Sequence, residues 1–237
     1  MKNFTILSSN RVGSTVLREA LNSHSKLKVL DEFFCWNCEY WTRFRNEFLL
    51  DIGENPADFN KRSDCRNVLK HLFERYNGLK LHRWQFSDDN PSWNYIFNNS
   101  KIVFLYRKNK IQQFISLKRS QKDKIWHVRN NESIPKRKKI KLNLQELNNF
   151  INFETYQENQ KTNALREFDY IKVCYEDLNN NIESVFSNIL SFIDIDYEPL
   201  EVNLKKMNKQ SIQQNVFNYE ELIEQFKNTH YEFMLNE

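Results

Sequence analysis

The sequence predicts an α/β protein with a central parallel sheet flanked by helices. Short apolar runs rich in β-branched and aromatic residues alternate with segments in which apolar residues recur at helical spacing, a pattern typical of strand–helix units around a parallel sheet. The chain has 237 residues, of which 40% are hydrophobic and 19 are Phe. It can therefore bury a substantial core. We expect one domain spanning residues 1–237.

The expected elements follow from these runs. Buried strands are predicted at residues 4–8, 27–30, 79–82, 101–106 and 170–174. Helices are predicted at residues 15–22, 66–76, 110–121, 144–160 and 182–192. In the fourth of these helices, Leu144, Leu147 and Ile151 share one face, which we expect to face the core.

The composition argues against several classes of protein. A net charge of +4 at pH 7 suits an anionic small ligand but falls short of the basic bias of a dedicated nucleic-acid binder. No run approaches the roughly 18 apolar residues of a membrane span. Polar residues from Ser8 to Arg11 interrupt the first apolar stretch, unlike a secretory signal. We expect a soluble, cytoplasmic protein.

Two of the four cysteines, Cys35 and Cys38, form a C-x-x-C pair. Such a pair suggests redox chemistry or zinc binding. A tetrahedral zinc site needs two more ligands, and the sequence has no second close pair of Cys or His. We therefore expect free thiols in a reducing compartment and no metal site.

The segment Ser9-Asn10-Arg11-Val12-Gly13-Ser14-Thr15 lies between the first predicted strand and the first helix. Backbone N–H groups at a helix N-terminus attract anions, a glycine allows close approach, and Arg11 adds positive charge. The G-x-x-x-x-G-K-[ST] phosphate loop is absent, because no Lys follows the glycine. An ordinary strand–helix turn with a Ser or Thr cap remains the alternative.

The residues Arg11-Val12-Gly13-Ser14-Thr15 resemble the 5′-phosphosulfate loop of sulfotransferases that use 3′-phosphoadenosine-5′-phosphosulfate (PAPS), with the pattern R/K-x-G-S/T-T. A second resemblance covers residues 101–117, where a strand ends in Arg107 and Lys108 and a helix carries Ser116. In the family, a cation and a Ser at these positions hold the 3′-phosphate. Two basic residues at the strand end are similar to the bacterial carbohydrate and trehalose-type branch, and which of them faces the phosphate stays open.

Two further segments resemble the same family. Tyr175-Glu176-Asp177-Leu178 is similar to a Y-E-D-L segment after a late strand, which we interpret as structural. The residues around Lys209 resemble a C-terminal basic loop that closes over the nucleotide, so Lys209 is a candidate phosphate ligand. The resemblance implies a P-loop-like sulfotransferase fold, PAPS as co-substrate, the nucleotide product PAP and no metal.

The resemblance also implies a reaction. Sulfuryl transfer needs in-line geometry, neutralised oxygens and a general base for the acceptor hydroxyl. Arg11 would stabilise the developing charge, while backbone N–H groups from Val12 to Thr15 hold the 5′-phosphate. Glu32, after the second strand, resembles the catalytic Glu of the carbohydrate branch and of the heparan N-sulfotransferases, and an exposed acid at a strand end is the alternative. Its neighbours Phe33, Phe34 and Trp36 predict a raised pKa, because apolar surroundings disfavour the charged form.

Lys80-Leu81-His82 offers a second candidate base. It resembles the K-x-H of cytosolic sulfotransferases, where the His is the base and the Lys contacts the sulfuryl group. A structural His is the alternative for His82. Trp84, Trp126 and His127 are candidates for the acceptor pocket or for the core.

The predicted function is therefore sulfuryl transfer from PAPS to a hydroxyl, with a carbohydrate or glycolipid acceptor favoured by the branch resemblance. One alternative is a kinase-like nucleotide phosphotransferase, which lacks its expected Lys and acidic metal ligand here. The other is a non-catalytic nucleotide-binding protein on the same fold. Acceptor identity, oligomeric state and pathway stay open.

Overall fold

A computed structural model describes residues 2–36, 38–133, 138–205 and 210–235. The chain forms two compact units. The first comprises Met1–Ser9, Gly13–Tyr106 and Ala164–Val202, and the second comprises Asn10–Val12, Arg107–Asn163 and Asn203–Glu237. The α/β class with a central parallel sheet is confirmed.

The first unit holds the sheet. Its strands run in the order β2-β3-β1-β4-β5, and every neighbouring pair is parallel. The strands are β1 (Asn3–Ser8), β2 (Val29–Leu30), β3 (Gly78–His82), β4 (Ser100–Tyr106) and β5 (Tyr170–Cys174). Because β1 lies between β3 and β4, the chain after β1 emerges where the direction of the strand order reverses, which is where open α/β sheets bind ligands.

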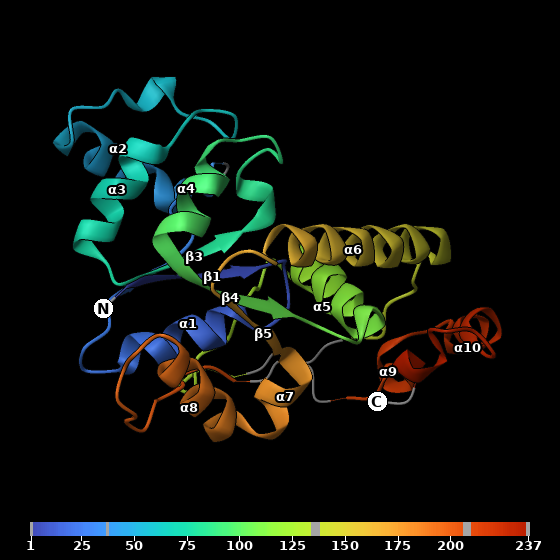
Figure 1. Cartoon of the computed structure of the whole chain (residues 1–237). Coiled ribbons are helices and arrows are strands. Elements are labelled where there is room, and N and C mark those ends of the chain that lie inside the picture. The colour runs from blue at the N-terminus through green and yellow to red at the C-terminus, as the bar shows by residue number, and fades with distance from the viewer. Residues whose placement is uncertain (1, 37, 134–137, 206–209, 236–237) are drawn as a thin grey trace. The chain divides into compact units, whose positions relative to one another are not determined.

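Helices cover both faces of this sheet (Figure 1). On one face lie α2, α3 and α4, and on the other lie α1, α7 and α8. Their bounds are α1 (Ser14–Ser23), α2 (Glu39–Asp51), α3 (Arg66–Arg75), α4 (Ser92–Asn99), α7 (Tyr175–Asn180) and α8 (Ile182–Phe192). Two short 3-10 helices, η1 (Pro56–Asp58) and η2 (Arg83–Gln85), belong to the same unit.

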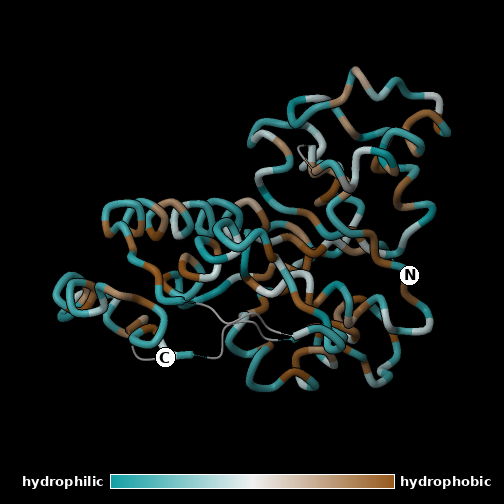
Figure 2. The backbone as a smooth tube through the Cα atoms, turned by 180° about the vertical axis from the view of Figure 1, so that it is seen from behind, coloured by the Kyte–Doolittle hydropathy of each residue, from teal (hydrophilic) through white to brown (hydrophobic). Residues whose placement is uncertain are grey.

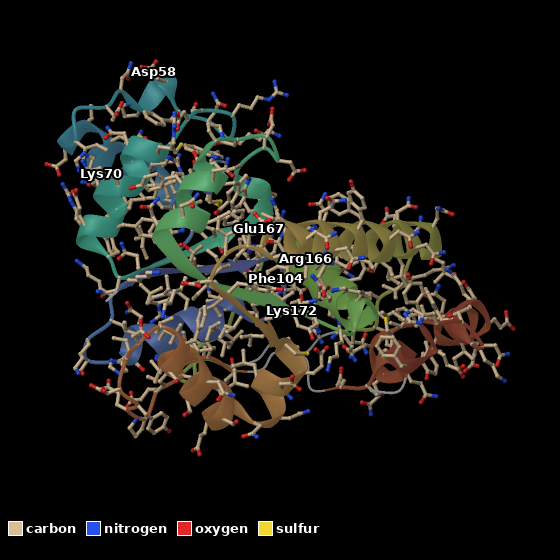
Figure 3. The ribbon with its side chains drawn as sticks, in the orientation of Figure 1. Asp58, Lys70, Phe104, Arg166, Glu167 and Lys172 are labelled. Atoms are coloured by element: carbon tan, nitrogen blue, oxygen red, sulfur yellow. A yellow bond between two sulfur atoms is a disulfide. The ribbon has the colours of Figure 1, made fainter. Side chains whose placement is uncertain are left out.

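The core of the first unit is rich in aromatic side chains. Phe33 packs edge-on against Phe34 and Phe48, with ring centroids 5.0 and 5.2 Å apart. In Figure 2, hydrophobic stretches alternate with hydrophilic ones along the chain, as expected for elements that each bury one face. At the edge of the sheet, Lys172 of β5 lies opposite Phe104 of β4 in the strand register, and its ammonium is 6.0 Å from that ring (Figure 3).

The second unit is helical. It contains α5 (Lys110–Asp123), most of α6 (Leu144–Ala164), α9 (Ile212–Asn215), α10 (Tyr219–Phe226) and η3 (Glu232–Leu235). Its buried cluster joins Ile111 and Ile115 of α5 to Leu147 and Ile151 of α6. The predicted core-facing position of Leu147 and Ile151 is therefore confirmed, whereas Leu144 is only partly buried against the cluster.

Each predicted strand and helix is present, with bounds that differ by a few residues. The largest difference among the strands is at β2, where only Val29 and Leu30 pair with β3. Apolar periodicity did not predict α2, α4, α7, α9 or α10. In α2, Trp41, Phe44 and Phe48 recur at helical spacing. Aromatic residues of this kind are also enriched in strands, so the segment did not distinguish a helix from a strand. Among the described residues, no helix has the length and apolar character needed to cross a membrane.

We expect Gly78→Ala to destabilise the first unit. A Cβ atom at position 78 would lie 2.3 Å from Cζ of Phe4, whose side chain is fully buried and cannot move aside. Overpacking of this kind costs about 1–3 kcal/mol, measurable as a shift in the urea midpoint. In a Phe4→Leu background the added cost of Gly78→Ala should shrink, and an unchanged cost would contradict the clash.

Candidate functional site

The candidate site of the first unit gathers at the carboxyl ends of its strands. Lys80 and His82 lie in β3, Ser8 ends β1, and Glu32 follows β2 by two residues. Because the sheet is parallel, these ends meet at one edge. Glu32, which was selected from a separate stretch of sequence, therefore contacts both Lys80 and His82.

Lys80 is the centre of this group. Its side chain is 1% exposed, and its ammonium lies 2.6 Å from Oε1 of Glu32 and 2.8 Å from Oδ1 of Asp31. It also donates a hydrogen bond of 3.1 Å to Oγ1 of Thr15 in α1. A buried ammonium needs such partners, because an unpaired buried charge is strongly destabilising.

Glu32 differs from the sequence-based expectation in its ionisation. Burial acts to raise the pKa of Glu32, but the hydrogen bond from His82 and the charge of Lys80 together outweigh it, so the pKa lies well below its usual range. The raised pKa inferred from the aromatic neighbours is therefore wrong. Phe33 and Phe34 pack into the core, whereas the carboxylate faces two polar partners.

His82 is buried, and both of its ring nitrogens have protein partners. Nε2 lies 3.0 Å from Oε1 of Glu32, and Nδ1 lies 3.2 Å from Oγ of Ser8. Trp84 stacks on the imidazole with ring centroids 5.8 Å apart and is itself 41% exposed. Glu32, with its side chain 23% exposed, is thus more accessible than His82 at 5%.

The N-terminus of α1 follows Gly13, which has a positive φ of 87°. A Cβ at this position would lie 2.8 Å from the ring of Tyr175, so both backbone conformation and packing require glycine. This contact gives a structural reason for the Tyr175 segment. The first turn of α1 has no acidic residue and no side-chain cap among the described residues, which suits an anion.

In the second unit, Arg11 and Ser116 are in contact. Nε of Arg11 donates to Oγ of Ser116 at 3.0 Å, and its guanidinium also donates to the carbonyl of Trp126 at 2.6 Å. The Trp126 side chain is 43% exposed. Two residues predicted from separate motifs of the PAPS pattern are thereby in contact within the second unit.

The strand-end cations Arg107 and Lys108 have different surroundings. Arg107 is buried and donates a hydrogen bond of 3.4 Å to the carbonyl of Arg11, whereas Lys108 is exposed. The Asn109 side chain caps α5, because it accepts a hydrogen bond from the backbone N–H of Gln112 at 2.9 Å. Lys209 lies outside the described residues.

The cysteine expectation needs a correction. A disulfide joins Cys35 and Cys38, where free thiols were predicted. The turn after Glu32 places their Cα atoms 5.4 Å apart, inside the range that a disulfide requires. The other two cysteines, Cys65 and Cys174, are buried free thiols as expected.

Sequence reasoning missed Asp31, Arg18 and Ser8 as parts of the site. Asp31 links the ammonium of Lys80 to Arg18, whose guanidinium donates to its carboxylate at 3.1 Å. Ser8 contacts His82. The position of Asp31 beside Glu32 could have indicated that it belongs to the site. The partners of Asp31, however, come from α1 and β3, and the local sequence does not show them.

A comparison with protein-family models shows the family to which the chain belongs. Residues 65–228, more than half of the chain, match the Stf0 sulphotransferase model. The chain belongs to this sulfotransferase family. The matched range contains the Arg107–Ser116 region and Lys80, and it begins after Glu32 and the loop at residues 9–15. No curated protein sequence matches the chain.

Solved structures show the same fold. The sulfotransferase domain of the Synechococcus PCC 7002 olefin synthase is 18% identical with a TM-score of 0.51, and the match covers 84% of this sulfotransferase and 76% of that chain. A sulfotransferase from Alicyclobacillus acidocaldarius is 14% identical with a TM-score of 0.51, covering 95% and 91%. These likenesses confirm the predicted P-loop-like sulfotransferase fold.

The ionisation of Glu32 predicts how stability depends on pH. Since folding lowers the pKa of Glu32, its ionised form stabilises the folded state above the ordinary value of 4.5, and this stabilisation is lost as the pH falls below that value. Urea midpoints should therefore fall more steeply with acidification in the wild type than in Glu32→Gln. Glu224→Gln, an exposed control in α10, should keep the wild-type slope. Equal slopes for the wild type and Glu32→Gln would contradict the network.

Proposed function

We propose that this sulfotransferase moves the sulfuryl group of PAPS to a hydroxyl of a carbohydrate or glycolipid, with Glu32 as general base. The observation that carries the proposal is the contact of Glu32 with Lys80 and His82 at the carboxyl edge of the sheet. A carboxylate that is ionised and partly exposed can accept a proton from an acceptor hydroxyl.

The proposed donor ligands follow the family pattern residue by residue. In the first unit, Gly13, Ser14 and Thr15 bind the 5′-phosphate through the N-terminus of α1. The conformation of Gly13 and the absence of acidic residues in the first turn of α1 fit an anion there. In the second unit, Arg107 and Ser116 bind the 3′-phosphate, with Arg11 beside Ser116 as a further cationic ligand. Val12, Lys108 and Lys209 stay weaker candidates for donor binding.

Lys80 is the proposed cation for the transferred group. Its ammonium contacts Thr15 of the phosphate-binding helix terminus and Glu32 of the base, so it links donor and base within the first unit. During transfer the acceptor oxygen forms a bond to sulfur, the bond from sulfur to the bridging phosphate oxygen breaks, and the acceptor proton passes to Glu32. PAP leaves with the bridging oxygen.

Donor binding also activates the base in this scheme. In the structure, the charge of Lys80 lowers the proton affinity of Glu32. A negatively charged sulfuryl group near Lys80 offsets that positive charge and so raises the proton affinity of the carboxylate. His82, with both nitrogens engaged, acts as a positioning residue that holds Glu32 rather than as the base.

The carbohydrate acceptor rests on the branch resemblance and on Trp84. This indole is 41% exposed and stacks on His82, which in turn contacts Glu32. An exposed aromatic face next to the base suits the flat apolar face of a sugar ring. We therefore propose that Trp84 packs against the acceptor.

The donor site is tested by calorimetric titration with PAP and with adenosine 5′-monophosphate, which lacks only the 3′-phosphate. Arg107→Ala should weaken PAP binding by roughly tenfold to a hundredfold, because a hydrogen-bonded charge pair is lost, and should leave the monophosphate unaffected. Lys108→Ala, the exposed neighbour, should change PAP binding far less. Equal weakening for both nucleotides would contradict the role of Arg107, and preference for ATP with Mg²⁺ would contradict the donor.

Catalysis is tested with Glu32→Gln and a panel of monosaccharides, disaccharides and phenols, by measuring conversion of PAPS to PAP. We expect kcat to fall about 10²–10⁴-fold, as for loss of a general base, with PAP affinity unchanged.

Trp84→Ala should raise KM for the sugar acceptor more than it lowers kcat. Turnover with phenols alone would overturn the carbohydrate assignment, and full activity of Glu32→Gln would overturn the base.

A further inference from the structure

We propose that Glu32, Cys35 and Cys38 form a binding site for a thiophilic divalent cation of the Zn²⁺ class once the Cys35–Cys38 disulfide is reduced. One donor atom from each of these side chains lies within 4.8 Å of the other two. The pair lacked further ligands in the sequence, but the turn after β2 adds a third donor from Glu32. Two thiolates and a carboxylate are all established zinc ligands.

The geometry of the turn supports this set. The N–H of Cys35 donates to the carbonyl of Glu32 at 2.9 Å, and the N–H of Cys38 donates to the carbonyl of Cys35 at 3.2 Å. Arg45 anchors the turn by donating to the carbonyl of Cys35 at 2.9 Å. In a tetrahedral zinc site, donor atoms are separated by roughly 3.5–3.8 Å. Small side-chain rotations would bring the three donors to that spacing around a cation.

The carboxylate has an oxygen available for the cation. Within the described residues, the hydrogen bonds from Lys80 and His82 both end on Oε1 of Glu32, and none ends on Oε2. Ligating carboxylates are commonly held by such hydrogen bonds to their other oxygen. Lys80 and His82 would thus orient Glu32 as a ligand, with water completing the coordination.

The local charge also favours a dication in the reduced state. Asp31 pairs with both Lys80 and Arg18, so the two positive side chains are already balanced by Asp31 and Glu32. With the guanidinium of Arg45 counted, which donates to the carbonyl of Cys35, two thiolates would still leave a net negative charge, which a divalent cation offsets.

Reduction has a defined route. Cys38 is partly exposed, whereas Cys35 is buried, so a small dithiol can attack Sγ of Cys38 and release Cys35 as the leaving thiolate. The second thiol of the reductant resolves the mixed disulfide, leaving two protein thiols and an oxidised reductant. Binding of the cation then displaces one proton from each thiol.

The cation site goes beyond the proposed function, but one consequence rests on it. A cation on Oε2 would occupy the carboxylate that we propose as the base. Sulfuryl transfer should therefore be inhibited by Zn²⁺ in the reduced protein and insensitive to Zn²⁺ in the oxidised one.

The site is tested by adding Co²⁺ to protein reduced with a phosphine and then freed of it. We expect a near-ultraviolet thiolate-to-cobalt charge-transfer band that Zn²⁺ abolishes. The band should be absent from oxidised protein and from Cys38→Ser, and retained in Cys174→Ser, where another cysteine beside a carboxylate is removed. Glu32→Gln should keep the band but weaken Co²⁺ binding about tenfold or more.

Two outcomes of this titration would overturn the site: no band in the reduced wild type, or a band that persists in Cys38→Ser. Because Cys38→Ser could perturb folding, the reduced wild type is also alkylated with iodoacetamide, and Zn²⁺ should protect Cys38 from modification. Absence of protection counts against the site. If the band and protection appear but Zn²⁺ leaves turnover unchanged, the cation site stands and the assignment of Glu32 as base fails.

Discussion

The buried ammonium of Lys80 is the interaction on which the candidate site depends. Its side chain is 1% exposed, so the folded state requires negative partners close to it. Asp31 and Glu32 meet that requirement from the end of β2, and Thr15 adds a hydroxyl from the start of α1. One charge in β3 therefore ties together the end of a neighbouring strand and the helix terminus proposed to bind phosphate. The parallel sheet makes this possible, because it brings the carboxyl ends of β1, β2 and β3 to one edge.

Together with the hydrogen bond from His82, the same charge lowers the pKa of Glu32. Burial alone would favour a protonated carboxyl group, yet His82 and Lys80 keep the group ionised. This balance makes the proton affinity of Glu32 sensitive to any other charge that Lys80 meets. An anionic donor or a thiolate pair would raise the proton affinity, and a cation would lower it. The proposed role of Glu32 in catalysis and its proposed response to metals thus have a common electrostatic origin.

Gly13 and the Cys35–Cys38 turn illustrate how local sequence acquires its meaning from packing. Glycine at position 13 was interpreted as permitting close approach of an anion, and the structure adds the ring of Tyr175, which excludes any Cβ. Free thiols were expected at the C-x-x-C pair because no second close pair of Cys or His accompanies it, and its spacing carries no information about the turn that contains it. The turn places Cys35 and Cys38 at disulfide distance and beside Glu32.

The sequence by itself determined the α/β class, the five strands and the family. Apolar periodicity depends on local burial, and the motifs around Arg107 and Ser116 are contiguous segments. Only the tertiary structure decided that Arg107 is buried while Lys108 is exposed, that both nitrogens of His82 are engaged, and that the pKa of Glu32 is lowered. Each of these properties depends on partners distant in the sequence: Arg11 for Arg107, Ser8 for His82, and Lys80 for Glu32. Pairing energies of this kind arise only when segments distant in the sequence fold against one another.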